Sequence, residues 1–256
     1  MRRTIVGLAA LLAVVVAGGL VYLWMAGGSG EPSTDLTTPP IAADTTPATD
    51  SEPNADEATT TTAAVTSSMS GNDDSDLTFV IDQEGSTASF ALDEELRGAP
   101  THVVGLTNEV AGQLRFDPSD LASAAVSPIV VNARTFQTDS ATRDRAIRGP
   151  VILDSASDEF ELITFDPTVI EGLEGSADVG DTLVFTILGD LTIKGVTVPV
   201  TFDVEARWAD GSRLEGVASA TVDRTDFGIG IPSVANVANV TEDVVLTFSF
   251  TAVSGA

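Results

Sequence analysis

The sequence predicts an all-β domain that follows an apolar N-terminal segment and an acidic linker. Alternating apolar and polar residues recur from Thr78 to the end of the chain, and this period of two is typical of strands with one buried face. Helical patterns do not alternate with these segments, which disfavours a parallel α/β architecture. Residues 1–77 differ in composition from the rest, so we expect them to lie outside the domain.

The chain opens with Arg2 and Arg3, followed by an uncharged stretch whose apolar body is Ile5–Ala26. At about 1.5 Å per helical residue this body spans roughly 33 Å, close to the hydrocarbon thickness of a bilayer. We therefore expect residues 1–28 to form an uncleaved membrane anchor with the remaining chain outside the cytoplasm. The alternative is a signal peptide cut near Ala17, which would release a secreted protein.

Residues 29–77 are rich in Thr, Pro, Ala, Ser, Asp and Glu and contain no aromatic residue. Such a composition buries too little apolar surface to offset the entropy of ordering, so we expect a disordered linker. Its ends would lie roughly 35–42 Å apart as a flexible chain. The expected role is a tether that holds the domain off the membrane, with a glycosylated stalk as the alternative.

The domain, residues 78–256, contains at least eight segments with strand periodicity. Their apolar faces are, in chain order, Phe79 and Ile81; Ala88, Phe90 and Leu92; Val110, Leu114 and Phe116; Ile129, Val131 and Ala133; Leu183, Phe185 and Ile187; Val198, Val200, Phe202 and Val204; Leu214, Gly216, Ala218 and Ala220; Val244, Leu246, Phe248 and Phe250. Lys194-Gly195 predicts a turn between two of them. The pattern alone leaves open whether the strands close as a barrel or stack as a sandwich.

Two short helices are predicted between the strands. Asp117-Pro118 before SDLASAA offers an N-cap acid and a proline at the first helical position. The second helix would lie within Thr138–Arg148, where two acid–arginine pairs have i,i+4 spacing. The pairs are Asp139 with Arg143 and Asp144 with Arg148.

Charge and composition exclude several classes of function. The net charge is −26, from 38 acidic and 12 basic residues, and such a surface repels phosphate backbones, so we expect no nucleic-acid partner. There is no cysteine, which excludes disulfides, thiol catalysis and thiolate metal sites. His102 is the only histidine and no G-x-S-x-G motif accompanies it, so we interpret it as a polar strand or loop residue. We expect no catalytic residue, metal or cofactor.

Several blocks together resemble the YceI-like family. Two carry most of the likeness, GDLTIKGVTVPVTFDV at residues 189–204 and DRTDFGIG at residues 223–230. Three more occur in the family's order: FVIDQEGSTASF, VVGLTNEVAGQLRFDP and RDRAIRGPVILDSASDEFELITF. They span Phe79 to about Ala252. The chain departs from the family at Pro150, where an acidic or aromatic residue is common, and at Glu161-Leu162, in a segment where members often have a proline.

The resemblance implies an eight-stranded antiparallel lipocalin-like β-barrel of an exported protein, with an isoprenoid of the polyprenyl or quinone type inside. Fatty-acid derivatives and other amphiphiles are associated with the same fold. We thus expect a membrane-tethered, extracytoplasmic protein that binds such a lipid without chemistry. The alternatives are an enzyme acting on a small hydrophobic substrate and a ligand-free adhesion or stress-response module. The lipid's identity, a carrier as opposed to a storage role, and formation of a homodimer stay open.

A lipid chain needs an apolar lining, because burial contributes about 25 cal/mol per Å². The candidate lining residues are Phe90, Leu92, Leu114, Phe116, Ile129, Val131, Phe185, Ile187, Val200, Phe202, Ala218, Leu246 and Phe248. The alternative is that they fill a packed core, although the small residues Gly216, Ala218 and Ala220 favour open space. Candidate head-group residues are Arg143, Asp144 and Arg148, for which we favour structural ion pairs. Residues 223–226 are expected to form a turn with internal hydrogen bonds.

Overall fold

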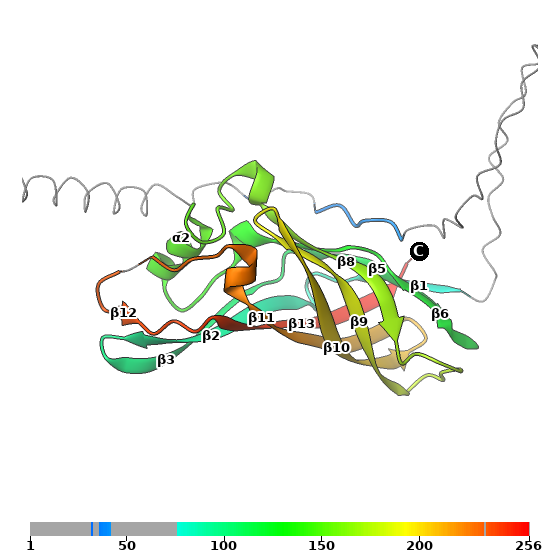
Figure 1. Ribbon diagram of the computed structural model, residues 1–256. Coiled ribbons are helices and arrows are strands. Elements are labelled where there is room, and N and C mark those ends of the chain that lie inside the picture. The colour runs from blue at the N-terminus through cyan, green and yellow to red at the C-terminus, as the bar shows by residue number, and fades with distance from the viewer. Residues whose placement is uncertain (1–31, 33–35, 42–75, 233, 256) are drawn as a thin grey trace, which may run out of the picture.

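Strands make up most of the described chain, as the alternating pattern predicts (Figure 1). The computed structural model describes residues 32, 36–41, 76–232 and 234–255. The strands are β1 (Leu77–Ile81), β2 (Thr87–Leu96), β3 (Ala99–Thr107), β4 (Val110–Ala111), β5 (Gln113–Asp117), β6 (Asp120–Val126), β7 (Ile129–Asn132), β8 (Leu162–Glu171), β9 (Thr182–Ile193), β10 (Val196–Asp210), β11 (Arg213–Asp223), β12 (Val237–Ala238) and β13 (Asp243–Ser254). The described part has one α-helix, α2 (Ala141–Arg148), and 3₁₀ turns at Ala133–Thr135, Asp158–Phe160 and Arg224–Phe227.

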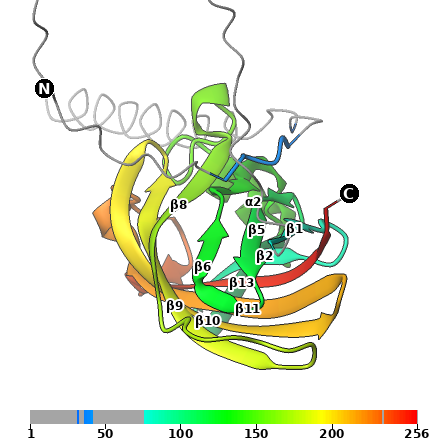
Figure 2. The same ribbon diagram turned by 90° about the vertical axis from the view of Figure 1, so that its right-hand side faces the viewer.

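The strands form a single, strongly curled antiparallel sheet, visible from its end in Figure 2. Its order is β4-β7-β8-β9-β10-β11-β13-β1-β5-β6, and β2 extends it through pairs with β13, β3 and β12. Every strand pair in it is antiparallel. The all-β prediction is therefore confirmed. Of the two arrangements left open by the sequence, the described part of the structure has one curled antiparallel sheet and not a sandwich of two stacked sheets.

Breaks within long strands explain why more strands are found than the sequence predicts. β1 and β2 both pair with β13, β2 through residues 245–249 and β1 through residues 252–254. They are thus two parts of one strand that bends between Ile81 and Thr87. β4 and β5 are separated by Gly112 alone, yet β4 pairs with β7 whereas β5 pairs with β1 and β6. Breaks of this kind let a strand change direction and tighten the curl of the sheet.

Turn chemistry confirms one prediction and corrects another. Lys194 and Gly195 have φ angles of 51° and 74° and join β9 to β10, which is the left-handed geometry of a tight hairpin turn. The helix predicted after Asp117-Pro118 is wrong, because β5 and β6 form a hairpin there. The Asp117 carboxylate accepts hydrogen bonds from the Ser119 amide and hydroxyl, both at 2.8 Å. An aspartate that caps a helix also closes a turn in this way.

The second helix prediction is confirmed within its expected range, as α2. Ser140 is its N-cap and accepts from the Arg143 amide. The expected Asp139–Arg143 ion pair is present. The other expected pair, Asp144 with Arg148, is not among the ion pairs of the described residues: buried Asp144 accepts from the Thr138 amide and hydroxyl, at 2.8 and 2.7 Å.

Arg148 also belongs to the framework around α2. It donates to the backbone oxygens of Arg134 and Phe136, each at 3.2 Å. The structural interpretation of Arg143, Asp144 and Arg148 thus agrees with their contacts, because each is engaged by neighbouring protein groups.

The predicted anchor, residues 1–28, lies outside the described residues, as does most of the predicted linker. No helix in the described ranges is long and apolar enough to span a bilayer. Within the linker, residues 36–41 lie beside the domain (Figure 1). The Gln113 side-chain amide donates to the Pro39 backbone oxygen at 2.9 Å. The first strand, β1, begins at Leu77, one residue before the expected start of the domain.

Candidate ligand cavity

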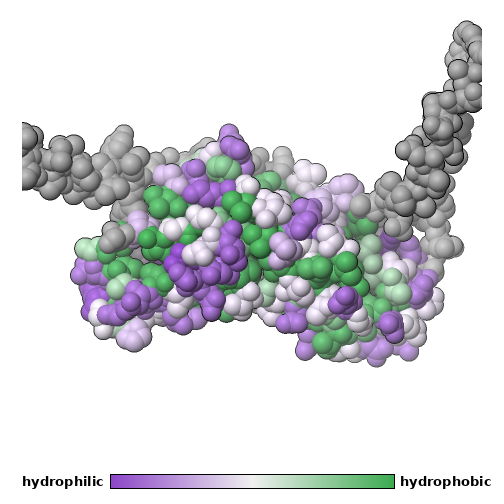
Figure 3. Space-filling model, in the orientation of Figure 1, coloured by the Kyte–Doolittle hydropathy of each residue, from purple (hydrophilic) through white to green (hydrophobic). Residues whose placement is uncertain are grey.

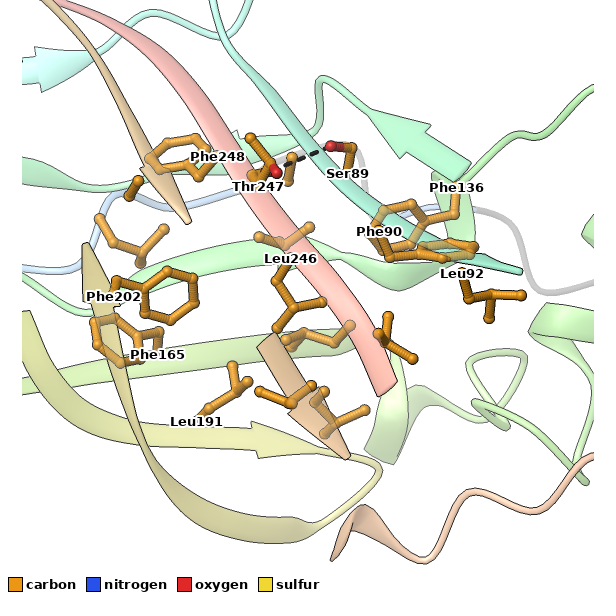
Figure 4. A pocket seen from close by; sticks show the side chains of 18 of the residues that line it. Ser89, Phe90, Leu92, Phe136, Phe165, Leu191, Phe202, Leu246, Thr247 and Phe248 are labelled. Carbon is orange, nitrogen blue, oxygen red and sulfur yellow. Dashed lines mark hydrogen bonds between the residues drawn. The ribbon is translucent and has the colours of Figure 1, made fainter. Parts of the chain in front are cut away.

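The curled sheet surrounds a cavity of about 710 Å³, within the range of roughly 300–1,000 Å³ typical of small-molecule sites. Its wall comes from the inward faces of most strands, and apolar side chains dominate it. Figure 4 shows Phe165, Phe202, Leu246 and Leu191 converging on one space from different strands. A lining of this kind suits an extended apolar ligand, because each buried methylene contributes about 0.8 kcal/mol.

Period-two alternation builds this wall. Phe202, Val204, Ala206 and Trp208 occupy every second position of β10 and all line the cavity. The residues between them, such as Asp203, face outward and are exposed. Because successive side chains of a strand point to opposite faces, one strand supplies both an apolar inner wall and an acidic outer surface. Figure 3 shows hydrophilic side chains mixed with apolar ones on the outside.

All the predicted lining residues except Val200 lie on the cavity wall. These are Phe90, Leu92, Leu114, Phe116, Ile129, Val131, Phe185, Ile187, Phe202, Ala218, Leu246 and Phe248. Val200 is buried but does not reach the cavity. Its cross-strand partner is Gly189, over which the ring of Phe165 lies, so that ring fills the space beside Val200.

The small residues of β11 leave less open space than we expected. A side chain at Gly216 would collide with the Phe250 ring, 2.6 Å away, so that ring occupies the space above the glycine. Ala220 is buried in the core, and only Ala218 of the three lines the cavity. Gly105 is likewise covered by the ring of Phe90, its cross-strand partner. Glycine opposite an aromatic ring is a recurring way to fill a curved sheet.

Two segments of the cavity wall are absent from the lining residues predicted from the sequence. One is the segment around α2, where Phe136, Ile147, Ile152 and Leu153 face the cavity. The other is the loop after Gly230, whose lining residues are Ile231, Pro232, Val234, Ala235, Val237 and Val240. The apolar character of that loop in the sequence signalled a place at the cavity mouth. The lining residues of α2 lie on one helical face, which a helical-period search of residues 138–148 would have found.

The cavity has an aromatic region and a polar region. Phe116 and Trp208 line it and pack edge to face, with ring centroids 5.4 Å apart. The polar region combines Glu94 from β2 with Asp139 and Arg143 from the start of α2. Figure 1 places α2, β12 and the β2–β3 hairpin at one end of the molecule. Ser89 donates to the Thr247 backbone oxygen at 3.3 Å, so its hydroxyl is engaged within the wall (Figure 4).

A buried ion pair supports the wall from outside the cavity lining. Arg134 and Glu161 are joined at 3.0 Å, and their side chains are 5% and 7% exposed. Asn132 donates to the other Glu161 oxygen at 3.1 Å, and Arg134 also donates to the Ser155 backbone oxygen at 2.6 Å. The period-two pattern places Asn132 and Arg134 opposite Val131 and Ala133, and the chain around Ser155 buries them there.

His102 and Asp223 also contact neighbouring protein groups. His102 lies on β3, is exposed and contacts Asp93 at 2.7 Å through Nδ1. Asp223 accepts from the hydroxyl and the amide of Thr225, at 2.6 and 2.7 Å. These hydrogen bonds hold the pKa of the Asp223 carboxyl below its usual range, which matches the predicted turn. Within the described ranges no cluster of potential ligands has the arrangement of a metal site.

A family model described as a YceI-like domain matches residues 79–252, well over half of the chain. The chain belongs to the YceI-like family. The resemblance found in the sequence is thereby confirmed, and the match covers the strands that surround the cavity. The curled antiparallel sheet is consistent with the lipocalin-like fold expected of a YceI-like domain.

Related proteins and structures support the same assignment. A UPF0312 protein from Shewanella denitrificans is 30% identical over 174 residues, which cover 66% of this chain and 85% of that protein. One from Vibrio vulnificus is 29% identical over 159 residues, which cover 60% of this chain and 78% of that protein.

Two solved structures share the fold of the YceI-like domain. A polyisoprenoid binding domain from Saccharophagus degradans, implicated in plant cell wall breakdown, matches with a TM-score of 0.55 at 12% identity. The match covers 70% of this chain and 99% of that structure. Burkholderia cenocepacia BcnA matches with a TM-score of 0.51 at 20% identity, over 67% and 98% of the two chains.

Proposed function

We propose that this protein binds an isoprenoid or a similar amphiphilic lipid in its cavity and carries, stores or sequesters it without chemical change. The observation that supports this most is the apolar cavity of about 710 Å³, enclosed by residues from nearly every strand. Membership of the YceI-like family agrees, as does the fold shared with a polyisoprenoid binding domain. Several polar groups of the cavity wall, those of Ser89, Arg143 and Arg224, are engaged in ion pairs or hydrogen bonds, which favours binding over catalysis.

In the proposed binding protein, the curled sheet closes as the expected eight-stranded barrel. The strand pairing supports this interpretation, because residues 110–117 pair with β7 at one end and with β1 at the other. Through this stretch, neighbouring strands connect β1, by way of β7 to β11 and β13, back to β1. A closed wall would leave the cavity accessible chiefly from its ends.

The binding proposal is tested by extracting the purified full-length protein with organic solvent and analysing the extract by mass spectrometry. We expect a lipid with a long unsaturated or saturated chain in an amount comparable to that of the protein. Delipidated protein should take up an added polyprenyl compound. Absence of lipid in the extract, combined with no uptake of polyprenyl compounds, would contradict the proposal.

We further propose that residues 1–28 anchor the protein in a membrane with the cavity domain outside the cytoplasm. The support is the length and apolarity of Ile5–Ala26 behind two arginines. Cells that express the full chain should retain it in the membrane fraction after a high-salt wash and release it in detergent. External protease should then digest the domain in spheroplasts. A soluble product with the mass of residues 18–256 would support signal cleavage instead.

A further inference from the structure

The polar end of the cavity contains an arginine whose charge is already neutralised. Arg143 Nη2 donates to Glu94 Oε1 at 3.0 Å, and the two side chains are 17% and 9% exposed. Its other terminal nitrogen pairs with Asp139, which is 82% exposed. Two carboxylates therefore surround one guanidinium where β2 meets α2, and Arg143 brings no net positive charge to the cavity.

The other arginines on the cavity wall are held by protein groups or lie in solvent. Arg224 donates to the backbone oxygens of Thr241 and Ile229 at 3.0 and 2.8 Å, which fixes its guanidinium in place but leaves its charge. Arg115 Nε lies 3.4 Å from the Asp76 carboxylate. Arg97 is exposed at the β2–β3 turn, where water and salt screen its charge.

A phosphate beside Arg143 would meet the Glu94 carboxylate, which is 9% exposed, while the repulsion from the exposed Asp139 is screened by water. Repulsion between like charges is strong where water is excluded, and a phosphate that takes Arg143 would leave the buried Glu94 carboxylate without its partner, which is costly. The net charge of −26 adds to the repulsion. A hydroxyl or carbonyl head group avoids both effects, because a guanidinium has five N–H groups and can donate to one more neutral acceptor.

We propose that the cavity selects lipids with an uncharged head group, such as an alcohol or a quinone, over lipids with the same chain and a phosphate head group. This inference rests on the proposed function and adds a head-group class to it. The discriminating element is the Glu94–Arg143–Asp139 cluster.

The test compares two probes that differ only in the head group, farnesol and farnesyl phosphate. The chain has two tryptophans, Trp24 and Trp208. In the full-length Trp24→Phe protein, fluorescence therefore reports from Trp208 on the cavity wall. We expect the alcohol to bind at least about tenfold more tightly than the phosphate at low salt. Equal affinities, or tighter binding of the phosphate, would overturn the inference and leave the proposed function standing. Binding of neither probe would contradict both.

A Glu94→Gln substitution in the same background identifies the responsible group. It keeps an amide oxygen for Arg143 and removes one negative charge, so the affinity for farnesyl phosphate should rise by about tenfold. Any change in the affinity for farnesol should be smaller than this, because an uncharged head group is not repelled by the carboxylate. Asp203→Asn is the matched control, because it removes the same charge from the exposed outer face of β10 and should leave both affinities unchanged.

A double variant, Glu94→Gln with Arg143→Gln, completes the test. With the guanidinium removed, the gain for the phosphate should disappear. Retention of that gain in the double variant, or an equal gain in Asp203→Asn, would show that bulk charge and not this cluster sets the selectivity. Circular dichroism and thermal melting of each variant verify that the sheet is intact.

Discussion

Replacing Ala218 by phenylalanine should strongly weaken lipid binding, whereas the same replacement at the adjacent Val217 should not. Ala218 lines the cavity on β11, opposite Val204 and Phe248 in the neighbouring strands. A phenyl ring at this position has only the cavity to enter, because its lateral neighbours are already packed. The affinity for a polyprenyl probe should therefore fall by more than about tenfold, which corresponds to a loss of more than about 1.4 kcal/mol of binding free energy.

Val217 provides a matched control because its side chain lies on the opposite face of the same strand. It is 44% exposed, so a phenylalanine there points into solvent. Binding is measured by Trp208 fluorescence in the full-length Trp24→Phe background, and the amount of co-purified lipid is measured by extraction. Overpacking costs typically 1–3 kcal/mol of stability, so a thermal melt must accompany both variants. Undiminished binding by a folded Ala218→Phe protein would show that the ligand does not occupy this cavity.

The largest loss of stability should follow Glu161→Leu. This substitution removes the buried carboxylate that pairs with Arg134 at 3.0 Å and accepts from Asn132. It leaves a guanidinium that is 5% exposed without its buried counter-charge. Breaking a buried pair from one side typically costs about 3–5 kcal/mol. Urea unfolding of the full-length protein should show a lower midpoint and an unchanged slope.

A second acidic partner of Arg134 allows the loss of a buried ion pair to be compared with the loss of an exposed one. Arg134 also pairs with Asp158, whose side chain is 97% exposed. Asp158→Ala should cost less than about 1 kcal/mol, because exposed ion pairs are screened by water. Similar losses for the two variants would mean that the Arg134–Glu161 pair does not hold the segment around Ser155 against the wall.

The inward faces of the strands were predictable because alternation is a local property of the sequence. Phe202 and Leu246 reach the cavity for the reason their spacing suggests. Val200 has the same spacing, but the Phe165 ring from another strand lies beside it. The sequence of one strand cannot show which side chain its neighbour will place over it.

Other features depended on contacts between distant segments. Asn132 ends β7 and Arg134 lies in the 3₁₀ turn after it, and the chain near Ser155 buries both of these polar side chains. Asp117-Pro118 fits both a helix start and a hairpin turn, and the pairing of β5 with β6 decides between them. The ion pair between Glu94 and Arg143 joins residues 49 positions apart, a distance that local patterns do not reach.

The hydrogen bond from Gln113 to Pro39 limits how far the domain can lie from a bilayer. In a chain anchored by residues 1–28, only the stretch from Gly28 to Pro39 separates the anchor from the residue bonded to the domain. At ~3.3–3.6 Å per residue this stretch extends over about 40 Å at most. A lipid that leaves the bilayer would then have no more than about this distance to cross before it meets the protein.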